Sequence, residues 1–95
     1  MSSIRRLVLD VMKPHEPNTV RYATEVAGLD GVEGVNVVLV ETDRQVETIQ
    51  LTVEGADVSF ETVRELVEDL GGSVHSIDEV ACGDRFIEQA ETPQD

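Results

Sequence analysis

The first predicted strand, residues 4–13, is rich in β-branched and long apolar residues. Successive side chains of a strand point alternately to the two faces of a sheet. One face carries only apolar residues and is predicted to join the core: Leu7, Leu9 and Val11. The other face carries Val8, Asp10 and Met12, so a carboxylate stands between two apolar side chains.

Three further segments are predicted to be strands. Residues 35–42 and 46–54 alternate in the same way, and the polar link between them indicates a β-hairpin. Gly55 is expected to end the second of these strands. The fourth strand, residues 73–81, is less regular, because its apolar residues recur at intervals of three: Val74, Ile77 and Val80. A β-bulge would reconcile that spacing with a strand.

Two segments have the apolar periodicity of helices. The first, residues 17–27, starts with a proline, whose missing N–H has no helical partner at that position. Its buried side is predicted from spacing to hold Val20, Ala23, Ala27 and either Tyr22 or Val26. The second helix is capped by Asp57 or Ser59 and ends near residue 70. Its buried stripe is predicted to be Phe60, Val63, Leu66, Val67 and Leu70.

The element order strand–helix–strand–strand–helix–strand predicts an α+β fold. Right-handed crossovers turn this order into a ferredoxin-like βαββαβ sandwich, a four-stranded antiparallel sheet with two helices on one face. The first and third strands are expected to be central. At 95 residues the chain fits one domain, assigned to residues 1–87. Residues 88–95 are expected to form an acidic, disordered tail.

The sheet face without helices is unusually apolar for a solvent face. It is predicted to carry, around Asp10, the side chains of Val8, Met12, Val38, Val40 and Thr52. An apolar patch of this kind indicates an interaction site, so we expect another subunit to cover it at least in part.

Charge narrows the possible partners. The chain has 20 acidic and 7 basic residues, a formal net charge of −13, and Lys13 is its single lysine. Such a field repels nucleic acid and anionic membranes, and the composition is typical of a cytoplasmic protein that works in high salt. No signal peptide or membrane span is predicted. Cys82 is the only cysteine, which excludes an intrachain disulfide and disfavours a soft-metal site.

Several carboxylates fall inside or at the ends of predicted strands, where Asp and Glu are disfavoured. Oxygen ligands gathered on one sheet face suit a hard cation, Ca²⁺ or Mg²⁺. The candidate ligands are Asp10, Glu41, Asp43, Asp78 and Glu79, with Glu47 across the hairpin as a further donor. The spacing lacks the contiguous loop of an EF-hand. An acidic surface adapted to salt therefore remains the alternative interpretation.

The run Lys13-Pro14-His15-Glu16-Pro17 allows two interpretations. His15 and Glu16 are either a metal- or proton-handling pair, or turn and cap residues whose backbone the prolines fix. Ser76, His75 and Asp78 are not predicted to form a catalytic triad, because residues close together along a strand point to alternate faces of the sheet. With no nucleophile elbow, phosphate loop or zinc motif, the chain is predicted not to be an enzyme.

These runs resemble the archaeal family known as domain of unknown function 211. The resemblance spans about residues 4–87 and is carried by residues 9–17 (with KPHEP), 35–43, 53–55, 75–80 (HSIDEV) and Gly83. It implies a ferredoxin-like fold, ring-shaped homo-oligomers and an association with calcium, but no reaction. The extra acidity and lysine poverty are what we expect of a haloarchaeal member.

The sequence thus predicts a non-enzymatic cytoplasmic protein whose homo-oligomer is organised by calcium on sheet and loop carboxylates. The alternative is a regulatory domain that senses a small molecule at a subunit interface. In that case the glycine-punctuated link at residues 28–34 is the expected site.

Overall fold

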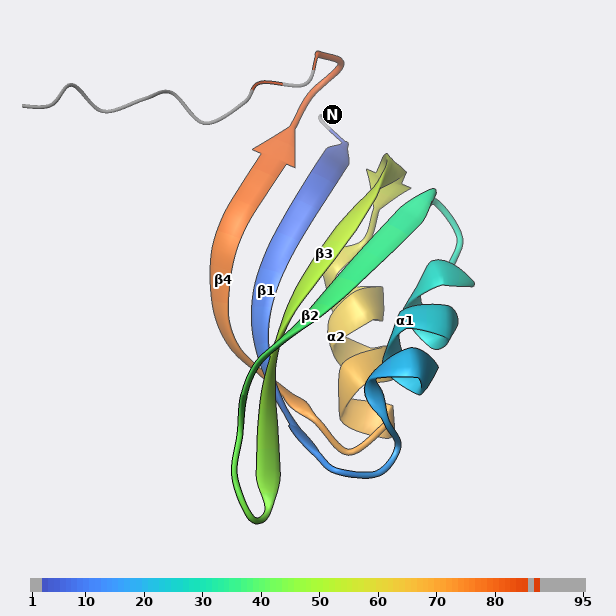
Figure 1. Cartoon of the computed structure of the whole chain (residues 1–95). Helices are drawn as coiled ribbons and strands as arrows, with labels where there is room; N and C mark the ends of the chain where they lie inside the picture. Colours follow the sequence, from blue (N-terminus) through green and yellow to red (C-terminus); the bar gives the residue numbers. More distant parts are fainter. Residues whose placement is uncertain (1–2, 86, 88–95) are drawn as a thin grey trace, which may run out of the picture.

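A computed structural model of the chain describes residues 3–85 and 87. Its elements in order are β1 (Ile4–Pro14), α1 (Thr19–Ala27), β2 (Gly34–Thr42), β3 (Val46–Val58), α2 (Phe60–Asp69) and β4 (Ser73–Cys82). The strands pair antiparallel in the order β2-β3-β1-β4, and both helices lie on one side of the sheet (Figure 1). The predicted ferredoxin-like α+β fold is confirmed. The predicted tail, residues 88–95, lies outside the described residues.

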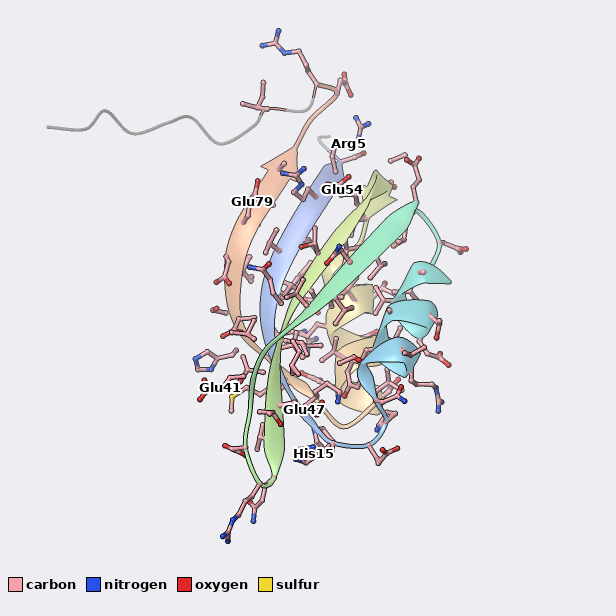
Figure 2. The ribbon with its side chains drawn as sticks, in the orientation of Figure 1. Arg5, His15, Glu41, Glu47, Glu54 and Glu79 are labelled. Atoms are coloured by element: carbon pink, nitrogen blue, oxygen red, sulfur yellow. The ribbon has the colours of Figure 1, made fainter. Side chains whose placement is uncertain are left out.

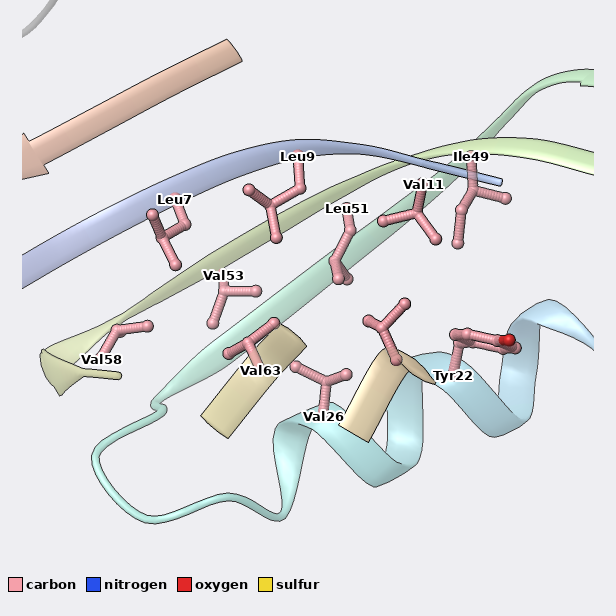
Figure 3. Packing of buried hydrophobic residues seen from close by; sticks show 11 residues of the cluster. Leu7, Leu9, Val11, Tyr22, Val26, Ile49, Leu51, Val53, Val58 and Val63 are labelled. Carbon is pink, nitrogen blue, oxygen red and sulfur yellow. The ribbon is translucent and has the colours of Figure 1, made fainter. Parts of the chain in front are cut away.

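The core lies between the sheet and the two helices. As predicted, Leu7, Leu9 and Val11 of β1 are buried. They lie beside Val53, Leu51 and Ile49 of the neighbouring strand β3, on the same side of the sheet (Figure 3). The helices supply the opposite layer with Tyr22, Val26, Val63 and Val67. Removing this apolar surface from water is the main favourable term in folding, about 25 cal/mol per Å². No helix in the described part of the chain is long and apolar enough to cross a membrane.

Helix α1 differs from the prediction at its start and on its buried side. It begins at Thr19, two residues after Pro17, because the side chain of Asn18 accepts a hydrogen bond from the Arg21 amide and caps the helix. Tyr22 and Val26 face the core, whereas Val20 is 65% exposed. Residues two positions apart lie on nearly opposite sides of a helix, so burial of Tyr22 turns Val20 outward.

Strand β3 continues through Gly55 to Val58, where the sequence predicted an end. The glycine is needed for a close approach: a Cβ on Gly55 would lie 1.9 Å from the carbonyl oxygen of Gly31. The link between α1 and β2 therefore crosses directly over this strand, and the Glu33 amide donates to the Glu54 carbonyl at 2.8 Å. The cap of α2 is Ser59, one of the two candidates.

Strand β4 contains the irregularity that its spacing predicted. Its pairing with β1 shifts between Val8 and Leu9 and again between Asp10 and Val11. The extra residues at these two shifts are Asp78 and His75. The bulges explain how apolar side chains three residues apart belong to one edge strand.

Candidate functional site

The sheet face opposite the helices, here called the open face, has apolar side chains around a central carboxylate. The register places Asp10 of β1 between Gln50 of β3 and Ser76 of β4. On either side of it along β1, Val8 is 9% exposed and Met12 is 38% exposed. Val38 of β2 is exposed opposite Gln50. Of the five side chains predicted for this face, the register places Val8, Met12, Val38 and Thr52 on it, whereas Val40 falls at a shift in the β2–β3 register. The residues paired with Val8, Met12 and Val38 are all polar, so the face is less apolar than predicted.

One end of the open face is organised by an arginine that the sequence reading missed. The guanidinium of Arg6 binds the carboxylate of Glu54 at 2.7 Å and that of Glu79 at 3.3 Å. Figure 2 shows both glutamates at this end of the sheet. Arg6 lies two residues before Val8 and so shares its face, which the alternation along β1 would have indicated. A cation that uses Glu79 must therefore compete with Arg6.

A hollow of about 460 Å³ opens on the sheet near this ion pair. It is lined by Val8, Gln50, Asp78, Glu79, Val80 and Ile87. The bulge places Asp78 beside Glu79 at the rim, and the hydroxyl of Ser76 donates to an Asp78 carboxylate oxygen at 2.7 Å. Two of the five predicted ligands therefore line one hollow.

The other three predicted ligands lie elsewhere. Asp43 shapes the hairpin turn, since its carboxylate accepts from the amides of Gln45 and Val46 at 2.9 Å each. These backbone hydrogen bonds lower the pKa of Asp43. Glu41 is exposed on the hairpin opposite Thr48, and Asp10 holds the centre of the open face. In the part of the chain that the structure describes, no three His, Cys, Asp or Glu residues form a group that could hold a metal ion.

A second polar cluster lies at the turn end of the β2–β3 hairpin, on the helix side of the sheet. Lys13 is only 1% exposed; its ammonium donates to Glu47 at 2.7 Å and to the Pro14 carbonyl at 2.8 Å, and lies 5.3 Å from the Tyr22 ring centroid. The hydrogen bond from Lys13 is the main reason that the pKa of Glu47 is lowered. Because Lys13 is two residues from Val11, the alternation itself directs it to the core side.

His15 joins the same cluster. One ring nitrogen, Nε2, lies 2.9 Å from the carbonyl oxygen of Asp43, and the other, Nδ1, lies 3.2 Å from Glu47. Figure 2 shows His15 and Glu47 at the hairpin end of the molecule. Glu16 is exposed and, within the described residues, forms no hydrogen bond or ion pair with His15. The structure thus pairs His15 with the hairpin and leaves Glu16 in solvent.

With this geometry in hand, comparison with known proteins identifies the family. The sequence profile of DUF211, described as "uncharacterized ArCR", matches residues 5–95. The chain belongs to the DUF211 family. It is also 44% identical over 95 residues to an uncharacterized protein of Methanocaldococcus jannaschii, covering 100% of this chain and 98% of that protein. The DUF211 match extends across the open face and the hairpin cluster alike, and neither description names a reaction or a ligand.

Proposed function

We propose that this DUF211 chain is a non-enzymatic, self-associating protein whose homo-oligomer is organised by a divalent cation, Ca²⁺ in preference to Mg²⁺. The observation that carries the proposal is the hollow on the open face. There, Asp78 and Glu79 line one hollow together with Val8 and Val80. An apolar patch favours association, and carboxylates at its rim make association dependent on charge.

Charge neutralisation is the proposed mechanism. A chain with a net charge of −13 repels its own copies, most strongly where acidic residues face each other across a contact. A divalent ion held between carboxylates of two copies removes that repulsion. Because the ion binds the assembled state better than the separate chains, mass action makes assembly rise with cation concentration.

The donor set fits a shared site better than a site within one chain. Asp78, Glu79 and the amide oxygen of Gln50 are hard oxygen donors on one hollow. Ca²⁺ takes six to eight oxygens, more than one chain offers there, so a second copy and water would supply the rest. Asp10 and Glu41 are the remaining candidates for that second contribution. Asp43 is the weakest candidate, since its carboxylate is engaged in the turn.

The deciding experiment is light scattering behind size-exclusion chromatography in high-salt buffer, with Ca²⁺, with Mg²⁺ and with chelator. We expect Ca²⁺ to enlarge the particle and chelator to reduce it. Asp78→Asn should lose the response, whereas Asp69→Asn, the same chemical change on an exposed position of α2, should keep it. An assembly of the same mass in all three buffers would contradict the role of the cation, and a monomer throughout would contradict self-association.

The acidic composition also supports a cytoplasmic location in a salt-accumulating cell. Screening at high ionic strength shortens the Debye length to about 3 Å at 1 M, which relieves repulsion among the 20 acidic residues. We expect the melting temperature to rise steadily when KCl is raised from about 0.1 to 2 M. A flat or falling melting temperature would count against salt adaptation.

A second candidate function, small-molecule sensing, is favoured by a different hollow. It has a volume of about 350 Å³ and is lined by Glu33, Gly34, Val35, Asn36, Thr52 and Glu54, next to the link that the sequence singled out. Its size lies at the lower end of ligand pockets. A metabolite screen by thermal shift in metal-free buffer tests it. A hit that is lost in Asn36→Ala but kept in Asp78→Asn would favour sensing over cation-driven assembly.

A further inference from the structure

Strand β2 lies at one edge of the sheet, and its outer side is open. In the part of the chain that the structure describes, β2 pairs with β3 alone, so every second amide and carbonyl along it points away from the sheet. From Gly34 to Leu39 the pairing with β3 runs without a shift, and the first shift comes at Val40. A regular edge of this kind is a template for hydrogen bonds to another extended segment.

The strand at the opposite edge, β4, is a poorer template (Figure 1). Its pairing with β1 shifts three times, and the longest stretch between shifts is Glu79–Ala81. Bulges of this kind twist an edge away and prevent strand addition in natural sheets. β4 also carries Asp78 and Glu79, whereas residues 34–40 of β2 have no charged side chain in a chain with a net charge of −13. The open edge is therefore that of β2.

The middle of β2 exposes apolar side chains on both faces of the sheet. Val38 is 48% exposed beside Gln50 on the open face, and Leu39 is 50% exposed beside Ile49 on the helix side. Val40, at the shift, is 61% exposed. Coverage of the open face by another subunit does not bury Leu39. A strand added beside β2 places side chains next to Val38 and Leu39 at the same time.

A hollow of about 350 Å³ lies beside this edge, at the start of β2. Gly34 lines it, and a Cβ on Gly34 would meet no atom of the described residues within 4 Å. The φ of Gly34 is not positive, so neither its backbone nor a neighbour requires glycine. Glycine in a strand often marks the close approach of a ligand or of another chain. Because Gly34 pairs with Glu54 of β3, the missing side chain leaves a path from the outer edge to that carboxylate.

We propose that the outer edge of β2 binds an extended segment of a partner protein, antiparallel to β2, with an arginine that enters the hollow beside Gly34. In strand addition, main-chain hydrogen bonds supply affinity and side-chain pockets supply specificity. Within the described residues Glu33, which also lines the hollow, forms no ion pair, and Glu54 is shared with Arg6. A guanidinium binds such carboxylates through paired hydrogen bonds.

Charge favours a partner of this chemistry over a second copy of the chain. Residues 34–43 contain no basic residue, so another β2 would cover the edge and leave the hollow without a cation. In antiparallel pairing, the residue opposite Gly34 lies toward the C-terminal end of the added segment. The segment therefore has apolar residues opposite Val38 and Leu39, followed by the arginine.

The test uses a capped heptapeptide of alternating valine and threonine that ends in arginine, and a matched peptide that ends in citrulline, which is uncharged. Hydrogen exchange of the β2 amides is measured with chelator present. At about ten times the Kd of the arginine peptide, every second amide between Gly34 and Leu39 should exchange about tenfold more slowly. The citrulline peptide should bind about threefold to tenfold more weakly. No protection at millimolar peptide, or equal binding of both peptides, overturns the proposal.

Two variants locate the contact. Gly34→Leu fills the hollow and should weaken the arginine peptide about tenfold, without a change in the protein's own fold, because a side chain there meets open space. Ser73→Leu, a similar enlargement at the exposed first residue of β4, should bind the peptide as the parent does. Unchanged binding by Gly34→Leu, or an equal loss in both variants, overturns the proposal. If Gly34→Leu does not fold, the two peptides still decide on the parent protein.

The inference does not rest on cation-driven assembly or on small-molecule sensing, and its test separates all three. With chelator present, the proposed cation has no effect on the peptide. Protection of the β2 amides that appears without peptide and rises with protein concentration would place a second copy on the edge and overturn the proposal. Capped arginine alone that binds as tightly as the peptide would make the hollow a small-molecule site without strand addition, which also overturns it.

Discussion

The two faces of β1 are built by the same backbone but have opposite compositions. Leu7, Leu9 and Val11 point to the helices and are at most 1% exposed. The intervening residues point to the open face, where Asp10 stands between an almost buried Val8 and a half-exposed Met12. Between Leu7 and Val11 the covered face is uniformly apolar, because these side chains exclude water from the core. On the open face, apolar side chains exposed to water are unfavourable, and the carboxylate among them does not contribute to the core.

The covered face of β1 contributes to stability, whereas the open face carries the residues of the candidate site. Apolar burial against two helices accounts for the stability of the fold, but a fold by itself does not determine a function. The charged groups that meet apolar surface lie on the open face and at the turn end of the β2–β3 hairpin. Substitutions on the two faces should therefore have different consequences, and the largest contrast is within β1 itself.

Leu9→Ala should have the largest effect on stability. Leu9 is 0% exposed in the centre of the core, so truncation removes buried methyl groups and leaves a cavity, at a cost of about 2–5 kcal/mol. Met12→Ala on the open face should cost less than about 1 kcal/mol in the dissociated chain. Urea denaturation in high salt measures both free energies of unfolding.

The same pair of variants also reports whether the open face becomes covered. In chelator and at low protein concentration, Met12→Ala should lower the free energy of unfolding by less than about 1 kcal/mol. In Ca²⁺ and at high concentration its cost should grow, because the face is then buried in the assembly. A cost for Met12→Ala that is independent of concentration and of cation would place the subunit contact elsewhere.

Lys13→Met should have the second largest effect. Among the basic residues of β1, Lys13 is buried on the covered face, whereas Arg6 remains partly in solvent on the open face. The substitution keeps the aliphatic stem but removes the hydrogen bonds to Glu47 and Pro14, and should lower the melting temperature by roughly 5–10 °C.

The pH dependence of this variant has a definite sign. Because the pKa of Glu47 is lowered in the folded protein, its contribution to stability is present above the unfolded carboxyl pKa and lost as the pH falls through the folded one. Lys13→Met removes the main cause of that shift. Its stability should therefore fall less steeply on acidification than that of the parent, and an unchanged slope would show that Lys13 does not hold the Glu47 charge.

The fold could be predicted because its determinants are local and periodic. Alternation identified the core face of β1, and the spacing of three in β4 predicted its bulges correctly. The errors arose where a contact distant in sequence decides the structure. Gly55 reads as a strand end, yet it lies within β3 because the carbonyl of Gly31 passes over it. Val20 reads as buried, yet it points outward because Tyr22, whose hydroxyl donates to the Leu70 carbonyl 48 residues away, faces the core instead.

The candidate site was less predictable, for two physical reasons. A strand pattern gives the face of a side chain but not its distance from side chains on other strands, so five plausible ligands did not reveal that only Asp78 and Glu79 share a hollow. The pattern also does not show which charges are already paired. Lys13 was overlooked because lysine is rarely buried unless paired, and its partner Glu47 is 34 residues away.

Glu79→Gln should have the smallest effect on the single chain and is therefore the most selective probe of the open face. Glu79 is partly exposed and Arg6 keeps its shorter bond to Glu54, so the loss should be less than about 1 kcal/mol. Glu25→Gln, which removes the partner of Arg21 on the outer surface of α1, is the matched control. Unfolding in chelator should hardly distinguish the two variants, whereas the Ca²⁺ needed for half-maximal assembly should rise for Glu79→Gln alone. Equal behaviour in both assays would remove Glu79 from the proposed cation site and leave its carboxylate as a partner of Arg6 only.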